Sequence, residues 1–154
     1  MKLIDLILPE RVAIKPAAAS KKEALDLLGE LLMKTAPATL ARSAIFESLA
    51  ARERLGSTGM GHGIAIPHGR LAELDAPQVA FIRLHDGVDF EAVDHEPVDI
   101  LVALVVPESA TSEHLELLAQ LARGLSQPDT IAAIRRAEDA EALYHTLQTA
   151  FDHG

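Results

Sequence analysis

His68 stands between Pro67 and Gly69, directly after a glycine-rich stretch that reads GSTGMGHGIAIPHGR over residues 56–70. A neutral imidazole has an ordinary pKa of about 6.5, so one ring nitrogen can attack an electrophile while an acceptor holds the other. Pro67 restricts the backbone that leads to the histidine, and Gly69 leaves one side of the ring without steric cover. These features favour a displayed nucleophile; a hydrogen-bonded structural histidine at a strand end stays the alternative.

The glycines that precede His68 could cradle a phosphate, because they allow backbone N–H groups to converge on an anion. The sequence Gly59–Gly63 does not satisfy the dinucleotide-binding pattern, and a strand is expected after it where that motif requires a helix. The chain has no Gly-Lys-Ser/Thr, and the spacing Gly56–Gly59 does not match a nucleophile elbow. Nucleotide binding is therefore not predicted, and a plain tight connection stays open.

Composition limits the class of protein. A chain of 154 residues with 49% hydrophobic and 3% aromatic residues predicts one domain with an aliphatic core. The absence of cysteine excludes disulfides, thiolate nucleophiles and cysteine-rich zinc sites. A net charge of −9 without a basic stripe disfavours nucleic-acid binding and suits basic protein partners.

The N-terminal apolar patch is interrupted by Asp5 and followed by Pro9, so it does not read as a signal peptide. No stretch approaches the roughly 20 apolar residues that a membrane helix needs. We therefore expect a cytoplasmic protein with no membrane insertion.

Helices are predicted where apolar residues recur every three to four positions. The capping box Ser20–Glu23 opens a helix that runs to about residue 34. Thr39 is expected to cap a second helix that starts at Leu40 and stops at Gly56. Further helices are predicted from residue 112, over about 129–136 and over about 140–151, with residues 152–154 as a frayed tail.

Strands are predicted over residues 63–66, 79–84 and 98–106, the last buried on both faces because it is almost wholly apolar. Alternating residues predict another strand over 88–93, after a turn at Asp86–Gly87. Helices before and after the strands favour an α/β fold, a mixed central sheet flanked by helices on both faces in a single compact domain over residues 1–154.

The run Arg52–Gly69 resembles the active-site signature of enzyme IIA domains of the fructose/mannitol type, from the bacterial phosphoenolpyruvate-dependent phosphotransferase system. A second stretch, Pro97–Pro107 followed by His114, resembles the same family, and the likeness extends from about Leu3 to Phe151. Within the family, the nitrogen-regulatory branch is the most similar.

The resemblance implies that His68 is phosphorylated by an HPr-like phosphocarrier, with His114 as the second active-site histidine and Arg52 as the cation that neutralises the phosphoryl group. No cofactor is implied. Hydroxyl and backbone N–H donors that could bind the phosphoryl oxygens are expected at Ser57, Thr58, Gly59, Gly61 and Gly69.

Structural explanations exist for each of these helpers. Arg52 would complement the negative end of its helix, and Ser57 and Thr58 would satisfy loop backbone. His114 would face solvent near a helix start. His62 departs from the family pattern, in which Asn is frequent. The remaining histidines, expected on the surface, are His85, His95, His145 and His153.

The function predicted is a phosphoryl carrier whose phosphorylation state controls nitrogen- or potassium-related targets, such as a sensor kinase or a transport subunit. Transfer to a separate sugar-specific IIB is an alternative. A hydrolase that binds a metal ion through His62, His68, His114 and Glu113 is an alternative of another class. A third is a non-catalytic interaction module in which His68 is structural.

Overall fold

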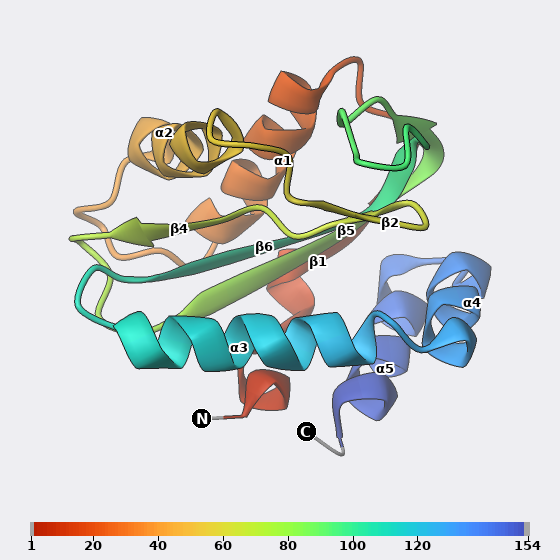
Figure 1. The fold of residues 1–154 in the computed structure, drawn as a ribbon. Coiled ribbons are helices and arrows are strands. Elements are labelled where there is room, and N and C mark those ends of the chain that lie inside the picture. The colour runs from red at the N-terminus through yellow and green to blue at the C-terminus, as the bar shows by residue number, and fades with distance from the viewer. Residues whose placement is uncertain (1, 153–154) are drawn as a thin grey trace.

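Residues 2–152 are described in the computed structural model, where a six-stranded mixed sheet lies between two layers of helices (Figure 1). The short 3₁₀ helices η1 (Leu3–Leu6) and η2 (Pro9–Arg11) come first. The strands are β1 (Val12–Lys15), β2 (Gly59–Gly61), β3 (Ile64–Ala65), β4 (His68–Leu71), β5 (Gln78–Val88) and β6 (Val98–Pro107). The α-helices are α1 (Lys21–Met33), α2 (Arg42–Glu53), α3 (Thr111–Gly124), α4 (Pro128–Arg136) and α5 (Ala140–Phe151).

The sheet has the order β1-β5-β6-β3-β2, and β4 also pairs with β6. Strands β1 and β5 are parallel, as are β3 and β4 with β6, whereas β5 and β6 are antiparallel. The predicted mixed sheet is therefore confirmed. Its central strand, β6, is buried as its apolar sequence indicates.

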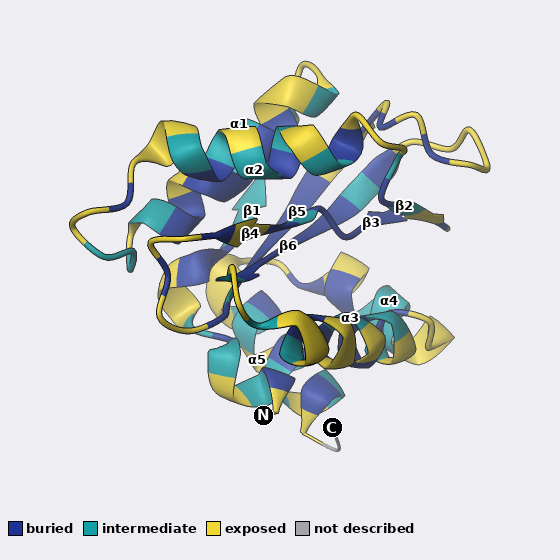
Figure 2. Ribbon diagram, turned by 60° about the vertical axis from the view of Figure 1, so that its left-hand side comes forward, coloured by how far each residue is buried: buried dark blue, intermediate teal, exposed yellow. Residues whose placement is uncertain are grey.

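Two apolar cores lie on opposite faces of the sheet. Side chains alternate along β6, so Leu101 and Ala103 face the core under α1 and α2, while Val102 and Leu104 face the core under α3, α4 and α5. Figure 2 shows buried residues on the inner sides of both helical layers and exposed residues on their outer sides. The prediction of helices on both faces is confirmed.

The predicted helix ends are correct where a side chain caps the backbone. Ser20 accepts the N–H of Glu23 at 3.1 Å and opens α1, and Asp139 accepts the N–H of Ala142 at 2.8 Å and opens α5. The cap predicted at Thr39 is wrong: α2 begins at Arg42 without a side-chain cap. No helix described within residues 2–152 has the length and apolar character to cross a membrane.

The turn predicted at Asp86–Gly87 and the strand predicted over residues 88–93 are wrong. Strand β5 continues through Asp86 and Gly87 and ends at Val88, after a shift in its register with β6. Residues 89–97 form a loop. Asp89 and Asp94 accept the N–H groups of Glu91 and Glu96, and this local bonding replaces a strand ladder. The alternating apolar residues are still buried, but against the core under α1 and α2.

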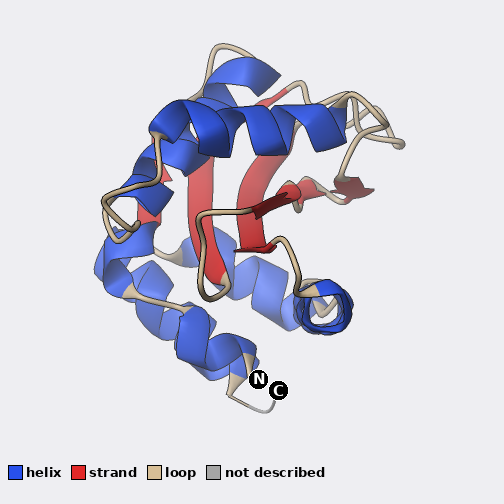
Figure 3. Ribbon diagram, turned by 90° about the vertical axis from the view of Figure 1, so that its left-hand side faces the viewer, coloured by secondary structure: helices blue, strands red, loops and turns tan. Residues whose placement is uncertain are grey.

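Strands β1, β2 and β4 were not predicted. Strands β3 and β4 run along the same side of β6, and the pairing is broken at residues 66–67 (Figure 3). Pro67 has no N–H to donate, but its carbonyl accepts the N–H of Leu104 at 3.0 Å. His68 therefore begins strand β4, where the sequence placed it at the end of the preceding strand.

Arg83 in β5 joins the sheet to the end of α4. Its buried guanidinium donates from Nη1 to the carbonyl oxygens of Ile134 and Arg135, both at 3.0 Å, and to that of Ala137. Carbonyls at a helix C-terminus have no partners inside the helix, and a cation complements their partial negative charge. Arg83 thus caps α4 from the sheet.

We expect Arg83→Met to lower the free energy of unfolding by about 2 to 4 kcal/mol, because it removes the buried donor that three carbonyls at the end of α4 share. Arg136→Met, an exposed residue of the same helical turn, should change it by less than about 0.5 kcal/mol. Urea denaturation at neutral pH measures both. Equal stability of the two variants would contradict the capping role.

Candidate functional site

The imidazole of His68 has a defined tautomer. Its Nδ1 lies 2.8 Å from the carbonyl oxygen of Ile66, which can only accept a hydrogen bond, so Nδ1 carries the proton. The lone pair of the neutral ring is then on Nε2. The ring is half-buried. His68 consequently presents one nucleophilic nitrogen in a fixed orientation.

His114 lies beside His68, on the first turn of α3. The two ring centroids are 5.2 Å apart with the planes at 78°, and only 8% of His114 is exposed. Within residues 2–152, neither ring nitrogen of His114 has a hydrogen-bond partner. The alternative that His114 faces solvent is wrong. A buried ring without hydrogen-bond partners, next to His68, suits a group that forms a hydrogen bond with a ligand when the ligand binds.

Burial keeps both imidazoles neutral. Desolvation, followed by the charges of His68 and Arg70, lowers the pKa of His114 to about 4. The pKa of His68 is also lowered, mainly by desolvation; the carbonyl of Ile66 acts against this shift and the charge of Arg52 adds to it. At neutral pH the ring of His68 is therefore uncharged, with its proton on Nδ1 and a lone pair on Nε2.

Two arginines supply positive charge. Arg52, on the last turn of α2, donates from Nη1 to the carbonyl of Gly56 at 2.8 Å and acts electrostatically on His68. Arg70, which the sequence analysis missed, acts on His114. Arg70 could have been found from its position two residues after His68, because residues two apart in a strand point to the same face of a sheet.

The hydroxyls of Ser57 and Thr58 are engaged within the protein. Ser57 Oγ donates to the carbonyl of Phe90 at 3.0 Å and accepts the N–H of Gly59 at 3.0 Å. Thr58 donates its hydroxyl and its backbone N–H to the carboxylate of Glu53. Ser57 therefore satisfies loop backbone, as its structural explanation expects, whereas the hydroxyl of Thr58 binds a side chain instead. Phosphate binding by both residues stays a prediction.

Close packing accounts for the glycines proposed to bind phosphate. A Cβ at Gly59 would lie 2.8 Å from the Cβ of Ala92, and one at Gly69 would lie 2.1 Å from Oγ of Ser48 in α2. Gly61 has φ of +88°, which favours glycine. Their N–H groups as phosphate donors stay a prediction.

His62 belongs to the turn between β2 and β3. It has φ of +59°, its N–H donates to Asp94 at 2.9 Å, and its carbonyl accepts from Arg135 at 2.7 Å. His, like Asn and Asp, adopts this left-handed conformation more readily than most residues do. The side chain of His62 is exposed.

His85, His95 and His145 are exposed, as predicted, and His153 with the end of the expected tail lies outside the described residues.

Among residues 2–152, no three His, Asp or Glu side chains come together in a way that could hold a metal ion. The ligand set named for the hydrolase, which included Glu113, therefore has no structural support there.

Comparison with known proteins identifies relatives of the whole chain. The family model for the phosphoenolpyruvate-dependent sugar phosphotransferase system, EIIA 2, matches residues 5–150. A nitrogen regulatory protein from Pseudomonas aeruginosa is 46% identical over 147 residues, which cover 96% of this chain and 95% of that protein.

Solved structures agree with this match. The crystal structure of nitrogen regulatory protein IIA-Ntr from Neisseria meningitidis has a TM-score of 0.86 at 38% identity, covering 94% of this chain and 98% of that one. The enzyme IIA–phosphorylated enzyme IIB complex for mannitol from Escherichia coli has a TM-score of 0.74 at 21% identity, covering 91% and 95%. The latter likeness shows a shared fold.

The lowered pKa of His114 predicts a loss of stability in mild acid. Because the pKa is about 4 in the folded chain and 6.5 for an unperturbed ring, the unfolded state takes up the proton first as the pH falls. The free energy of unfolding should decline from about pH 6.5 toward pH 4. His68 contributes in the same direction.

Denaturation curves at several pH values check this prediction. The decline should be smaller in His114→Gln and unchanged in His145→Gln, which alters an exposed ring. Identical pH dependence in the wild type and His114→Gln would contradict the burial argument.

Proposed function

Because this chain belongs to the EIIA 2 family of the phosphoenolpyruvate-dependent sugar phosphotransferase system, we propose that His68 accepts a phosphoryl group from a histidine of an HPr-like phosphocarrier. The resemblance found in the sequence is confirmed at the level of the family, which supports a phosphocarrier role. The observation that carries the proposal for His68 is its ring, held at Nδ1 by Ile66 and placed 5.2 Å from the buried ring of His114.

The transfer step uses the nitrogen that the structure leaves free. The lone pair of His68 Nε2 forms the new N–P bond while the N–P bond of the donor breaks, and that bonding pair stays on the donor imidazole. His68 keeps its proton on Nδ1, and the carbonyl of Ile66 stabilises the positive charge that develops on the ring. No additional general base is required to deprotonate the nucleophile.

Charge stabilisation dominates phosphoryl transfer, since little covalent chemistry is left to the protein. The phosphoryl group brings negative charge next to Arg52, Arg70 and the unsatisfied ring of His114. Arginine can hold phosphoryl oxygens through paired N–H donors. We propose that these three side chains replace the water around the transferred group.

A protein donor must reach a half-buried ring, and the surface near the site suits such a partner. Leu55 is 85% exposed one turn after Arg52, and Leu115 is 66% exposed next to His114. Exposed leucines that follow site residues offer apolar contacts to a docking protein. The net charge of −9 favours a basic partner surface.

The regulatory part of the proposal is that the phosphorylated and unphosphorylated forms bind target proteins differently. Its support is the nitrogen regulatory relatives, which match this chain over nearly their whole lengths. The targets that we propose are nitrogen- or potassium-related proteins, such as a sensor kinase or a transport subunit.

Transfer to a separate sugar-specific IIB is the alternative. It is tested by mixing the phosphorylated chain with such a domain and following the phosphoryl group.

Phosphorylation should require His68. Incubation with phosphoenolpyruvate, enzyme I and an HPr-like donor should add a single acid-labile phosphoryl group, seen in the intact mass of the wild type and of the control His62→Asn. His68→Ala should acquire none, because it lacks the nucleophile. An adduct that survives in His68→Ala would overturn the site, and a wild type that never acquires one would indicate an interaction module.

Phosphorylation should also raise the pKa of His114 above about 4, because the neighbouring dianion favours the protonated ring. Ring NMR shifts followed against pH, in the phosphorylated and unphosphorylated protein, measure this change. An unchanged titration of His114 would show that its ring does not face the phosphoryl group.

A further inference from the structure

Glu53 places a buried carboxylate where helix electrostatics disfavour it. It is the last residue of α2, at the negative end of the helix, and only 5% of its side chain is exposed. Its two oxygens accept the backbone N–H of Thr58 at 3.2 and 3.3 Å, and one also accepts the hydroxyl of Thr58. These hydrogen bonds from Thr58, in the loop that precedes His68, offset the cost of burying the carboxylate.

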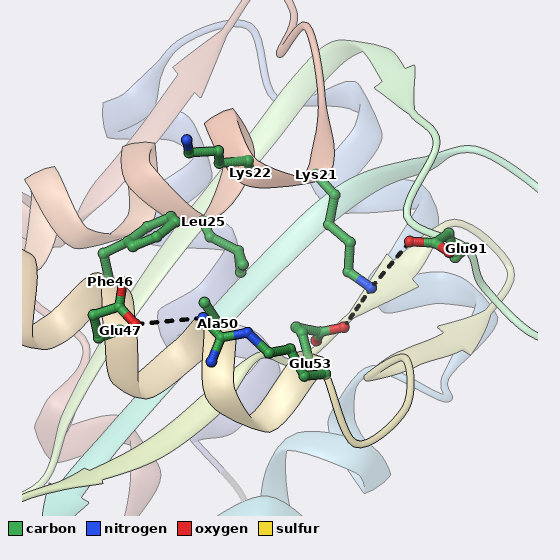
Figure 4. A pocket seen from close by; sticks show the side chains of 9 residues that line it. Lys21, Lys22, Leu25, Phe46, Glu47, Ala50, Glu53 and Glu91 are labelled. Carbon is green, nitrogen blue, oxygen red and sulfur yellow. Dashed lines mark hydrogen bonds and ion pairs between the residues drawn. The ribbon is translucent and has the colours of Figure 1, made fainter.

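Lys21 provides the counter-charge from the first turn of α1. Its Nζ lies 2.8 Å from Oε2 of Glu53, 3.8 Å from Oε1 of Glu91 and 4.9 Å from the centre of the Phe90 ring. Lys21 and Glu53 line a pocket of about 540 Å³ between α1 and α2, and Figure 4 shows their side chains pointing toward each other. The ammonium is thereby held by two carboxylates and an aromatic face.

An unbroken series of hydrogen bonds leads from this ion pair to the nucleophile. Thr58, bound to Glu53 through its N–H and hydroxyl, uses its carbonyl to accept the N–H of Ile66 at 3.1 Å. The carbonyl of the same Ile66 accepts Nδ1–H of His68 at 2.8 Å. Thr58 and Ile66 therefore transmit the position of Glu53 to the imidazole.

We propose that Lys21 and Glu53 are positioning residues for phosphoryl transfer: they hold Thr58, which fixes Ile66 through its N–H, and the carbonyl of Ile66 in turn holds His68 with Nε2 toward the donor. This inference rests on the proposed function of His68. It assigns to Thr58 a role that uses its hydroxyl inside the protein, because that hydroxyl donates to Glu53. Neither Lys21 nor Glu53 need touch the phosphoryl group.

The magnitude of the effect follows from the geometry of transfer. Misplacing a reacting atom by about 1 Å can cost a factor of about 100 in rate, so partial loosening of the ring should cost roughly tenfold. The loss should fall on kcat, since the surface that binds the donor is unchanged. A purely structural ion pair would lower stability and leave the ring tautomer as it is.

The direct test reads the tautomer of His68 by ¹⁵N NMR of the unphosphorylated protein at neutral pH. The wild type should have the proton on Nδ1. Lys21→Met and Glu53→Gln should each lower the Nδ1–H population and reduce kcat for phosphoryl transfer roughly tenfold with KM for the donor unchanged. Lys21→Arg, which keeps the ion pair, should have the Nδ1–H population and the kcat of the wild type.

The two variants also separate positioning from a through-space charge effect. A through-space effect would be confined to Glu53, whose charge raises the pKa of His68, whereas loss of positioning lowers the Nδ1–H population in both variants. The matched control is Glu47→Gln, which breaks the 3.4 Å pair with Arg54 in the same pocket but has no link to Thr58. It should leave the tautomer and kcat unchanged.

Unchanged tautomer and kcat in folded Lys21→Met and Glu53→Gln would overturn the proposal, as would equal effects from Glu47→Gln. If Glu53→Gln does not fold, Lys21→Met alone decides, because it keeps the carboxylate of Glu53 but removes the ammonium that holds it in position against Thr58. The tautomer is read without phosphorylation, so it tests positioning even if His68 proves not to be the acceptor. Loss of phosphorylation in His68→Ala tests the proposed function separately.

Discussion

The hydrogen bond from His68 Nδ1 to the carbonyl of Ile66 is the interaction on which the rest of the site depends. A free imidazole can carry its proton on either nitrogen and can rotate, whereas this ring has one tautomer and one orientation. Ile66 is fixed in turn on both sides, since its N–H donates to the carbonyl of Thr58 and the carbonyl of Pro67 accepts the N–H of Leu104 in β6. The break between β3 and β4 is therefore the place where the fold orients the residue that we propose as the nucleophile.

The surroundings of this ring suit the negative charge of the phosphoryl group that we propose it receives. His114 is buried without hydrogen-bond partners among the described residues, and Arg52 and Arg70 add positive charge nearby. Burial of an unsatisfied ring costs stability, which a phosphoryl group would recover by accepting its hydrogen bond. Such preorganisation spares the site from reordering its dipoles during transfer.

Much of the fold could be predicted because its signals are local. Ser20 and Asp139 cap their helices within three residues, and the apolar run of β6 marks a strand buried on both faces. The prediction of a strand over residues 88–93 was wrong because Asp89 and Asp94 accept hydrogen bonds from nearby backbone N–H groups. Residue propensities do not show whether such local bonds or a strand ladder will form. Strand β4 was missed because HGRL has too little apolar character to indicate a strand.

The site was only partly predictable for a related reason. His68, His114 and Arg52 came from a motif, but the motif does not show what each donor binds. The hydroxyls of Ser57 and Thr58 turn inward to Phe90 and Glu53, and the sequence carries no sign of that direction. The pair of Lys21 and Glu53 joins residues far apart in the chain, so only the packing of α1 against α2 brings them together.

The most direct test of this account is the position of the N–P bond on His68, determined from the ¹⁵N and ³¹P NMR spectra of the phosphorylated protein. The account predicts phosphorylation at Nε2, with Nδ1 still bound to the carbonyl of Ile66. Phosphorylation at Nδ1 would contradict it, because that nitrogen could not then carry the proton that the carbonyl of Ile66 accepts.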